Sequence, residues 1–148
     1  MTNEIKRIAR EHLAADGPDL SLRAVARDLG VVSSAVYRYF ESRDALLTAL
    51  IIDGYDSLGA AVEVAEAIVA RRDLSGRWLA TGRAVRAWAL ERPHEYALLY
   101  GSPVPGYAAP QDTIGPASRP VLVLTTILRD GVERGLLTPA DRLPRAVR

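Results

Sequence analysis

The chain contains no cysteine among its 148 residues. Disulfide bonds, thiol nucleophiles and thiolate metal sites are therefore excluded, and the reducing cytoplasm is the expected location. No run of eighteen apolar residues occurs, and the first residues, MTNEIKRIAREHL, have no long apolar core. On this basis we expect neither a membrane-spanning helix nor a signal peptide, and no membrane partner.

Motifs of catalysis are also missing from the sequence. It has no G-x-S-x-G turn, no glycine-rich phosphate loop and no pair of carboxylates in a recognisable frame. The two histidines, His12 and His94, stand alone, and no second histidine follows His94 at helical spacing. We therefore expect two hydrogen-bonded structural histidines, and we expect no enzyme, no metal site and no cofactor.

Charge of one sign is not in excess. The formal net charge is +1, and the first fifty residues carry seven Lys or Arg and seven Asp or Glu. Total charge therefore does not indicate a nucleic-acid partner, and a basic surface would have to come from placing charges on one face. The composition, 49% hydrophobic and 25% charged, is ordinary for a globular protein with one real core.

Almost every segment has the apolar spacing of an amphipathic helix, and no sustained alternation indicates a strand. Gly30, Pro93 and Gly135 mark expected helix ends. Prolines and glycines crowd into residues 102–120, which are expected to form a loop or broken turns. The sequence thus predicts an all-α fold, with helices over residues 3–15, 22–29, 33–40, 43–72, 73–92, 93–100 and 119–134, and a further helix beginning at Thr138.

Local signals also predict caps and faces for these helices. Ser21 and Ser42 are expected N-caps. Apolar residues share one side of their helix in four groups: Leu22, Val25, Ala26 and Leu29; Val36 and Phe40; Trp78, Val85, Trp88 and Ala89; and Val121, Leu124, Leu128 and Val132. Four arginines are expected on a solvent side: Arg77, Arg83, Arg86 and Arg92. Gly54 and Gly59 are expected weak points of the long helix.

The stretch from Leu20 to Phe40 joins two short helices through a glycine, as in the DNA-binding helix-turn-helix motif. In that motif the second helix enters the major groove with its N-terminal residues toward the base edges. Small side chains at residues 33–35 would let the backbone approach the groove, and their hydroxyls can bond to bases or phosphates. Tyr37, Arg38 and Tyr39 would add hydroxyls and a charge that reach phosphate.

The segment LRAVARDLGV, the aromatic run YRYF and the Ser-Arg-Asp helix start resemble the N-terminal domain of the TetR family of bacterial transcription regulators. The resemblance covers about residues 5–50. It implies base contacts from Ser33, Ser34 and Tyr37, backbone contacts from Ala35, Arg38, Tyr39 and Arg43, and a base or phosphate contact from Arg23. The alternative for the residues of the second helix is a solvated helix in an ordinary bundle. For Arg23 and Arg43 the alternative is a surface ion pair with Asp44 or Asp28.

Two residues depart from the family's pattern. Val32 stands where the family usually has Ser or Thr, so the usual cap is missing and Ser33 is expected to cap the helix instead. Ala35 cannot donate a hydrogen bond where many relatives have threonine. Both departures leave the fold as expected and the operator sequence open.

Further along, RAWALERPHEYALLYGSPVPGYAAP resembles the C-terminal body of one TetR subgroup, at Trp88, His94 and Gly101. The family implies a helix-turn-helix DNA-binding domain over residues 1–46, joined by a long helix to an all-helical body over 47–148 that binds an effector and dimerises. The candidates for lining an effector cavity are aromatic, with plain core packing as the alternative for each: Trp88, Tyr96, Tyr100 and Tyr107.

The resemblance implies a homodimer that binds a palindromic operator in double-stranded DNA and acts as a repressor released by a small-molecule effector. The alternative is a helical ligand-binding or interaction protein with a degenerate DNA-binding head, which the balanced charge of the first fifty residues favours. The family pairs through its last two helices, and the helix starting at Thr138 has little room before Arg148. The natural protein is therefore expected to continue, or the chain to have been cut.

Overall fold

The computed structural model describes residues 1–17 and 19–138, and this part of the chain is helical, with no strand. Its elements are α1 (Thr2–Asp16), α2 (Leu22–Asp28), α3 (Ser33–Tyr37), α4 (Arg43–Ala67), α5 (Leu74–Glu91), α6 (Pro93–Tyr100), the short 3₁₀ helix η1 (Gln111–Thr113) and α7 (Ile114–Glu133). The predicted all-α class is confirmed. The helix predicted from Thr138 onward falls on residues 139–148, outside the described residues.

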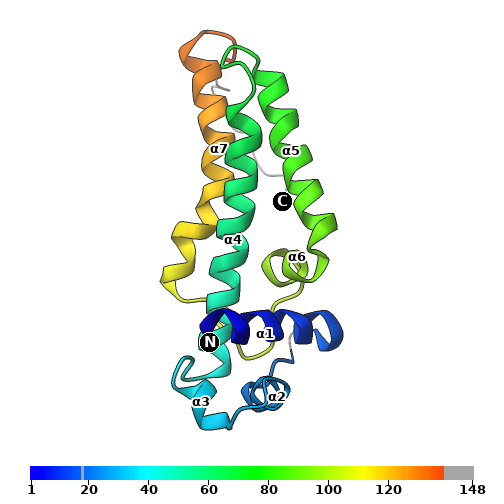
Figure 1. Ribbon diagram of the computed structural model, residues 1–148. Coiled ribbons are helices and arrows are strands. Elements are labelled where there is room, and N and C mark those ends of the chain that lie inside the picture. Colours follow the sequence, from blue (N-terminus) through cyan, green and yellow to red (C-terminus); the bar gives the residue numbers. More distant parts are fainter. Residues whose placement is uncertain (18, 139–148) are drawn as a thin grey trace.

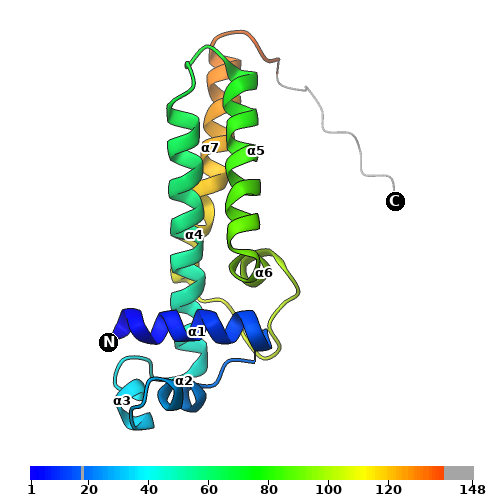
Figure 2. The ribbon, with the colours of Figure 1, turned by 45° about the vertical axis from the view of Figure 1, so that its right-hand side comes forward.

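α4 runs along the molecule and joins its two parts (Figures 1 and 2). The helices α1, α2 and α3 surround its first turns, and we call this part, residues 1–50, the head. The rest of α4 lies alongside α5 and α7, with α6 close to α1, and we call this part, residues 51–138, the body.

The head has a core of apolar side chains from all its helices. Its buried members include those predicted on α2 and α3: Leu22, Val25, Ala26, Val36 and Phe40. The two expected caps are present, because the side chain of Ser21 accepts the N–H of Ala24 at 3.4 Å and that of Ser42 accepts the N–H of Ala45 at 3.1 Å. Gly30 ends the first helix of the motif with a φ of +69°.

α3 is shorter than predicted and has no side-chain cap. It ends at Tyr37 because the N–H groups of Tyr39 and Phe40 both bond to the carbonyl of Val36, which closes the helix. Val32 is its N-cap residue, and Ser33 already lies inside the first turn. The prediction that Ser33 caps the helix is therefore wrong.

α4 ends at Ala67 rather than at Arg72. The chain turns there because Asp73 caps the next helix, accepting the N–H of Gly76 at 2.8 Å, so that α5 begins at Leu74. By length and composition alone α4 is apolar enough to cross a membrane. In this fold its buried side packs against α1, α5, α6 and α7.

Arg77 contradicts the predicted solvent side of α5, because its side chain is 0% exposed. Its Nε donates to Glu66 of α4, and its Nη1 lies 2.8 Å from Oδ2 of Asp130 of α7. Arg71 also reaches Glu66, at 2.8 Å. A buried charge needs such partners, and they come from helices far apart in the sequence. The spacing of apolar residues in the sequence therefore could not reveal that Arg77 is buried.

α7 begins at Ile114, within the stretch predicted as a loop. Pro116 lies in its first turn, where the helix uses no N–H group, so this proline is compatible with a helix start. Pro120 lies inside the helix.

Two predicted apolar groups include exposed residues. On α5, Trp88 is buried, but Trp78 is 47% exposed. On α7 the buried residues include Ile127 and Gly131, and the predicted stripe instead belongs to the exposed side, where the large apolar residues are Val121, Leu122, Leu128 and Val132. The stripe was placed correctly on a helix, but helical spacing alone does not say which of two apolar sides packs inward.

The two glycines of α4 are points of close contact with other helices. A Cβ on Gly54 would lie 3.3 Å from the side chain of Leu99 on α6, and one on Gly59 would lie 2.8 Å from the Cβ of Arg119 on α7. Arg119 is held there by two carboxylates of α4, those of Asp56 at 2.7 Å and Glu63 at 2.8 Å. The missing side chains let α6 and α7 approach α4 closely.

Candidate nucleic-acid interface and an adjoining cavity

α2 and α3 form the end of the molecule that points away from α5 and α7 (Figure 1). Val36, which is 0% exposed, and Phe40, which is 8% exposed, attach α3 and the turn after it to the head's core. The outer side is left to exposed residues: Ser34, Tyr37, Arg38 and Tyr39. The side chains of Tyr37 and Tyr39, two residues apart in the sequence, are 45% and 51% exposed at this end. A partner could cover them.

The remaining predicted DNA contacts surround this surface. Arg23 is exposed in the first turn of α2, and Ser33 and Ala35 are half-buried on α3. Arg43 is half-buried at the start of α4, with its Nη1 3.4 Å from Oδ1 of Asp44. The ion pair that the sequence offered as an alternative for Arg43 is thus present. The fold therefore places all eight predicted residues on α2, α3 and the following helix start and turn.

Asp28, at the end of α2, is held by α1. The Nε2 of His12 lies 2.6 Å from Oδ2 of Asp28, and the Nε of Arg27 lies 3.4 Å from its Oδ1. The hydrogen bond with His12 lowers the pKa of Asp28 below its ordinary value, because it stabilises the carboxylate. His12 is a structural hydrogen-bonding residue, as predicted.

Two basic residues of α1 face the body instead of the end of the head. The Nζ of Lys6 lies 2.9 Å from Oδ1 of Asp53, and Nη2 of Arg10 lies 2.8 Å from its Oδ2. Arg10 also reaches α6, with its Nε 3.5 Å from Oε2 of Glu95. These ion pairs tie α1 to α4 and α6. Arg23 and Arg27 of α2, and Arg38 directly after α3, remain exposed on the head.

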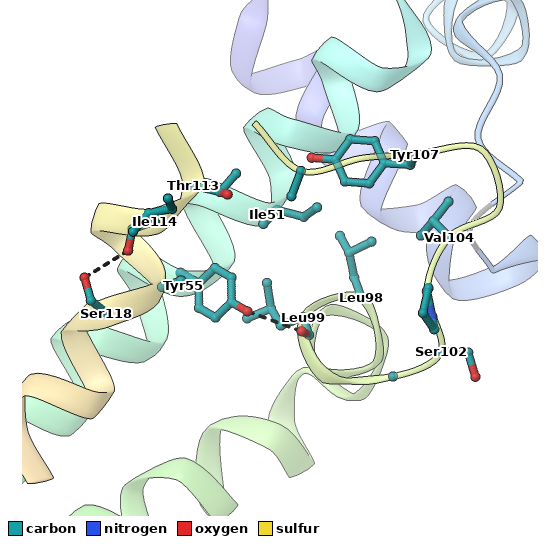
Figure 3. Close-up of a pocket in the computed structure, with 14 residues that line it drawn as sticks. Ile51, Tyr55, Leu98, Leu99, Ser102, Val104, Tyr107, Thr113, Ile114 and Ser118 are labelled. Carbon is teal, nitrogen blue, oxygen red and sulfur yellow. Dashed lines mark hydrogen bonds between the residues drawn. The ribbon is translucent and has the colours of Figure 1, made fainter. Parts of the chain in front are cut away.

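A cavity of about 600 Å³ lies between α4, α6 and the start of α7, next to the loop of residues 101–110 (Figure 3). Its lining is apolar with a few hydroxyls, and among residues 1–17 and 19–138 no Asp, Glu, Lys, Arg or His lines it. The hydroxyl of Tyr55 donates to the carbonyl of Leu99 at 3.3 Å. The hydroxyl of Tyr107 is hydrogen-bonded to Oγ1 of Thr48 at 2.9 Å.

Of the four aromatic residues expected to line a cavity, only Tyr107 does so. Trp88 is buried and donates to Oγ of Ser57 at 3.0 Å, so it has the alternative role of core packing. The rings of Tyr96 and Tyr100 pack against each other with centroids 5.2 Å apart and planes inclined at 43°, and both stay partly exposed.

Apart from Tyr107, the sequence reasoning missed the lining residues, among them Ile51, Tyr55 and Val104. For Val104 a signal existed, because V-P-G-Y is a turn sequence that places its first and last residues together. The other two lie on α4 among many similar residues, with no distinguishing signal. Within the described part of the chain, no group of three His, Cys, Asp or Glu residues could hold a metal ion.

A short outer helix, held by buried residues and presenting small and hydroxyl-bearing side chains, defines a helix-turn-helix protein with a helical body. Residues 6–50 match the family model of bacterial regulatory proteins of the tetR family, and residues 78–148 match that of the tetracyclin repressor-like C-terminal domain. The chain belongs to the TetR family. The second match includes Trp88, His94 and Gly101, on which the resemblance of the body rested.

Similar proteins include the HTH-type transcriptional regulators Mb1846 of Mycobacterium bovis and Rv1816 of Mycobacterium tuberculosis, each 47% identical over 140 residues. The alignment covers 93% of this chain and 60% of each regulator. The chain thus spans less than two thirds of the length of these relatives.

Two solved structures have the same fold. The regulatory protein SCO4313 is 41% identical with a TM-score of 0.78, over 88% of this chain and 62% of that one. A protein of unknown function from Rhodococcus sp. RHA1 is 29% identical with a TM-score of 0.80, over 95% and 72%.

Proposed function

We propose that this protein is a DNA-binding transcriptional regulator, with a DNA-binding domain over residues 1–46 and an effector-binding and dimerising domain over 47–148. The observation that carries the proposal is the surface of α3. Small residues at 33–35 are followed by exposed Tyr37 and Tyr39, while buried Val36 fixes the helix to the head. A helix with so little bulk can bring its backbone into the major groove. Membership of the TetR family supports the same function.

The proposed contacts follow the geometry of the helix-turn-helix motif. The N-terminal part of α3 faces base edges, and residues around it bind phosphates. The residues that we propose touch DNA are Arg23, Ser33, Ser34, Ala35, Tyr37, Arg38, Tyr39 and Arg43.

The proposed regulation is repression by a cytoplasmic homodimer on a palindromic operator, released by a small molecule. Two recognition helices reading one palindrome must stand about 34–36 Å apart. A small molecule that binds better to a conformation with another separation lowers DNA affinity by the ratio of its two affinities.

DNA binding is tested by fluorescence anisotropy, using the duplex upstream of the protein's own gene and a random-sequence pool. We expect tight binding that falls roughly 100-fold between about 50 and 200 mM salt if about four phosphates are neutralised. Absence of binding to both DNAs by a folded homodimer would contradict the proposal. That result would favour the interaction protein with a degenerate head.

A matched pair of variants locates the binding surface. Tyr37→Ala removes an exposed ring of α3 and is expected to lower DNA affinity at least about tenfold. Trp78→Ala removes a similarly exposed ring of α5, at 47% against 45%, and should leave the affinity within about twofold. Equal losses of DNA affinity in the two variants would show that α3 is not part of the DNA interface.

A further inference from the structure

Val32, the residue directly before α3, has an exposed apolar side chain. It is 71% exposed, more than any other large apolar residue in the described part of the head. Its neighbour Val31 packs instead against the core of the head. A single exposed valine is ordinary on a protein surface. The place of Val32 is unusual, however, because the next two residues, Ser33 and Ser34, are proposed to touch DNA.

The backbone on both sides of Val32 is held by hydrogen bonds. Its carbonyl accepts the N–H of Ala35 at 2.9 Å, in the first turn of α3. The N–H of Val31 donates to the carbonyl of Ala26 at 3.0 Å. Val32 itself is extended, with φ −68° and ψ 144°, and the branch at its Cβ restricts the side chain to few rotamers. The isopropyl group therefore has little conformational freedom to lose when a partner covers it.

Val32 also leaves α3 without a side-chain cap. A hydroxyl-bearing residue here could accept an N–H of the first turn, which valine cannot do. The head thus has an apolar side chain where helix stability favours a polar one. Departures of this kind from local preference are expected at functional sites. The exposed valine is therefore better explained by recognition of a partner than by folding.

The major groove offers an apolar side chain one kind of base contact. Valine has no hydrogen-bonding group in its side chain, so it cannot bond to a phosphate or to a polar base edge. The C5-methyl group of thymine is the apolar feature of the major-groove edges, where the other bases present donors and acceptors. In a helix-turn-helix protein, the N-terminal end of the second helix comes close to these edges. Val32 lies at that end of α3.

We propose that Val32 packs on the C5-methyl group of a thymine in each half of the operator, and that it makes the protein prefer an A·T pair at this position. The inference rests on the proposed function, because it needs α3 to lie in the major groove. It adds a residue that discriminates between bases to contacts that discriminate less. The hydroxyls of Ser33 and Ser34 can bond to a donor or to an acceptor, so they fit several bases.

Deoxyuridine tests this contact, because it lacks the C5-methyl group of thymine and keeps the same base pairing. Fluorescence anisotropy compares the duplex upstream of the protein's own gene, made once with thymine and once with deoxyuridine throughout. Burial of one methyl group corresponds to roughly fourfold in affinity. Contacts in two half-sites should therefore give the wild type a roughly 15-fold preference for the thymine duplex.

Val32→Ser and Val64→Ser form a matched pair for the same measurement. Val64 lies on α4 and is similarly exposed, at 66%. Val32→Ser should lower the ratio of the two affinities by roughly 15-fold, whereas Val64→Ser should keep the wild-type ratio. Loss of folding does not imitate this result, because the ratio compares two duplexes on the same protein and Val32→Ser supplies the missing cap acceptor.

The possible failures are distinguishable. A ratio that is equal in the wild type and in Val32→Ser would overturn the role of Val32 and leave DNA binding by the head in place. Absence of binding to both duplexes by the folded wild type would instead contradict the proposed function itself.

Single replacements locate the thymine in the shortest duplex that still binds. Deoxyuridine at one thymine in each half-site should account for the preference that Val32→Ser loses. At that position the wild type should also bind 5-methylcytosine paired with guanine more tightly than cytosine, because the methyl group lies on the same groove edge, and Val32→Ser should not. A preference spread evenly over many thymines would overturn the proposal.

Discussion

The head and the body are held together by different interactions. In the head the buried cluster is apolar throughout, and polar side chains act as caps or remain at the surface. In the body, Arg77 is fully buried between Glu66 and Asp130. The outer sides of α5 and α7 meanwhile carry exposed Trp78 and Leu122, at 47% and 58%.

The difference teaches where a sequence pattern determines structure and where a distant contact does. Head helices are short and are bounded by local signals, so one residue often defines an end. The body helices are long, and their relative placement depends on pairs such as Arg77 with Asp130, which are far apart in the chain. The variants below test this difference.

Arg77→Met should have the largest effect, because it leaves Glu66 and Asp130 without their buried cation. We expect the free energy of unfolding to fall by about 3 kcal/mol, measured by urea denaturation at neutral pH. Arg83→Met, at an exposed position of the same helix, should change it by less than about 0.5 kcal/mol. Equal losses in the two variants would mean that the body does not depend on its buried charge.

Gly59→Ala should have the next largest effect, and its direction is diagnostic. The new Cβ would lie 2.8 Å from the Cβ of Arg119, so we expect a loss of about 1–2 kcal/mol in thermal unfolding. Gly82→Ala, in the exposed middle of α5 with no atom within 4 Å, should instead gain about 0.5–1 kcal/mol from helix propensity. Stabilisation by both alanines would show that α7 does not pack tightly on Gly59.

Changes to the helix caps of the head should have a smaller effect on the free energy of unfolding, lowering it in one variant and raising it in another. Ser42→Ala removes the side-chain acceptor at the start of α4 and should lower the free energy of unfolding by about 1 kcal/mol. Val32→Ser adds an acceptor where α3 has none and should raise it by about 0.5 kcal/mol, since Val32 is 71% exposed. Chemical denaturation measures both. No change in either variant would contradict the view that local signals hold the head.

The smallest expected effect is a dependence of stability on pH, to which the head and the body both contribute. Hydrogen bonds from His12 and Arg77 lower the pKa values of Asp28 and Asp130 below the ordinary 3.8. A carboxylate whose pKa is lower in the folded state adds stability above its unfolded pKa, and this is lost as pH falls through the folded value. Urea midpoints between about pH 5 and pH 3 should therefore fall more in the wild type than in Asp28→Asn or Asp130→Asn. If the urea midpoints of wild type and variants fall in parallel with pH, these two carboxylates do not contribute to the acid dependence of stability.

Much of the head could be predicted from the sequence, because its signals are local. Ser21, Gly30 and Ser42 each bound an element through their own hydrogen bond or backbone conformation. The length of α3 was overestimated, since its end depends on two N–H groups that turn back to one carbonyl.

Less of the body and its cavity could be predicted, because they depend on tertiary contacts. Of the four aromatic residues expected to line a cavity, the three on α5 and α6 do not line this one, because aromatic composition does not distinguish a core from a cavity wall. The position of Tyr107 was predicted, but its bond to Thr48 joins residues far apart in the chain. Arg77 has no local signal at all.

Hydrogen–deuterium exchange with and without a bound DNA duplex tests the central claim most directly, namely that DNA is bound by the head through α3. We predict slower exchange of the amides of residues 33–44 in the complex, and unchanged exchange along α5 and α7. Protection of α5 or α7 in the complex, with residues 33–44 unaffected, would contradict the account.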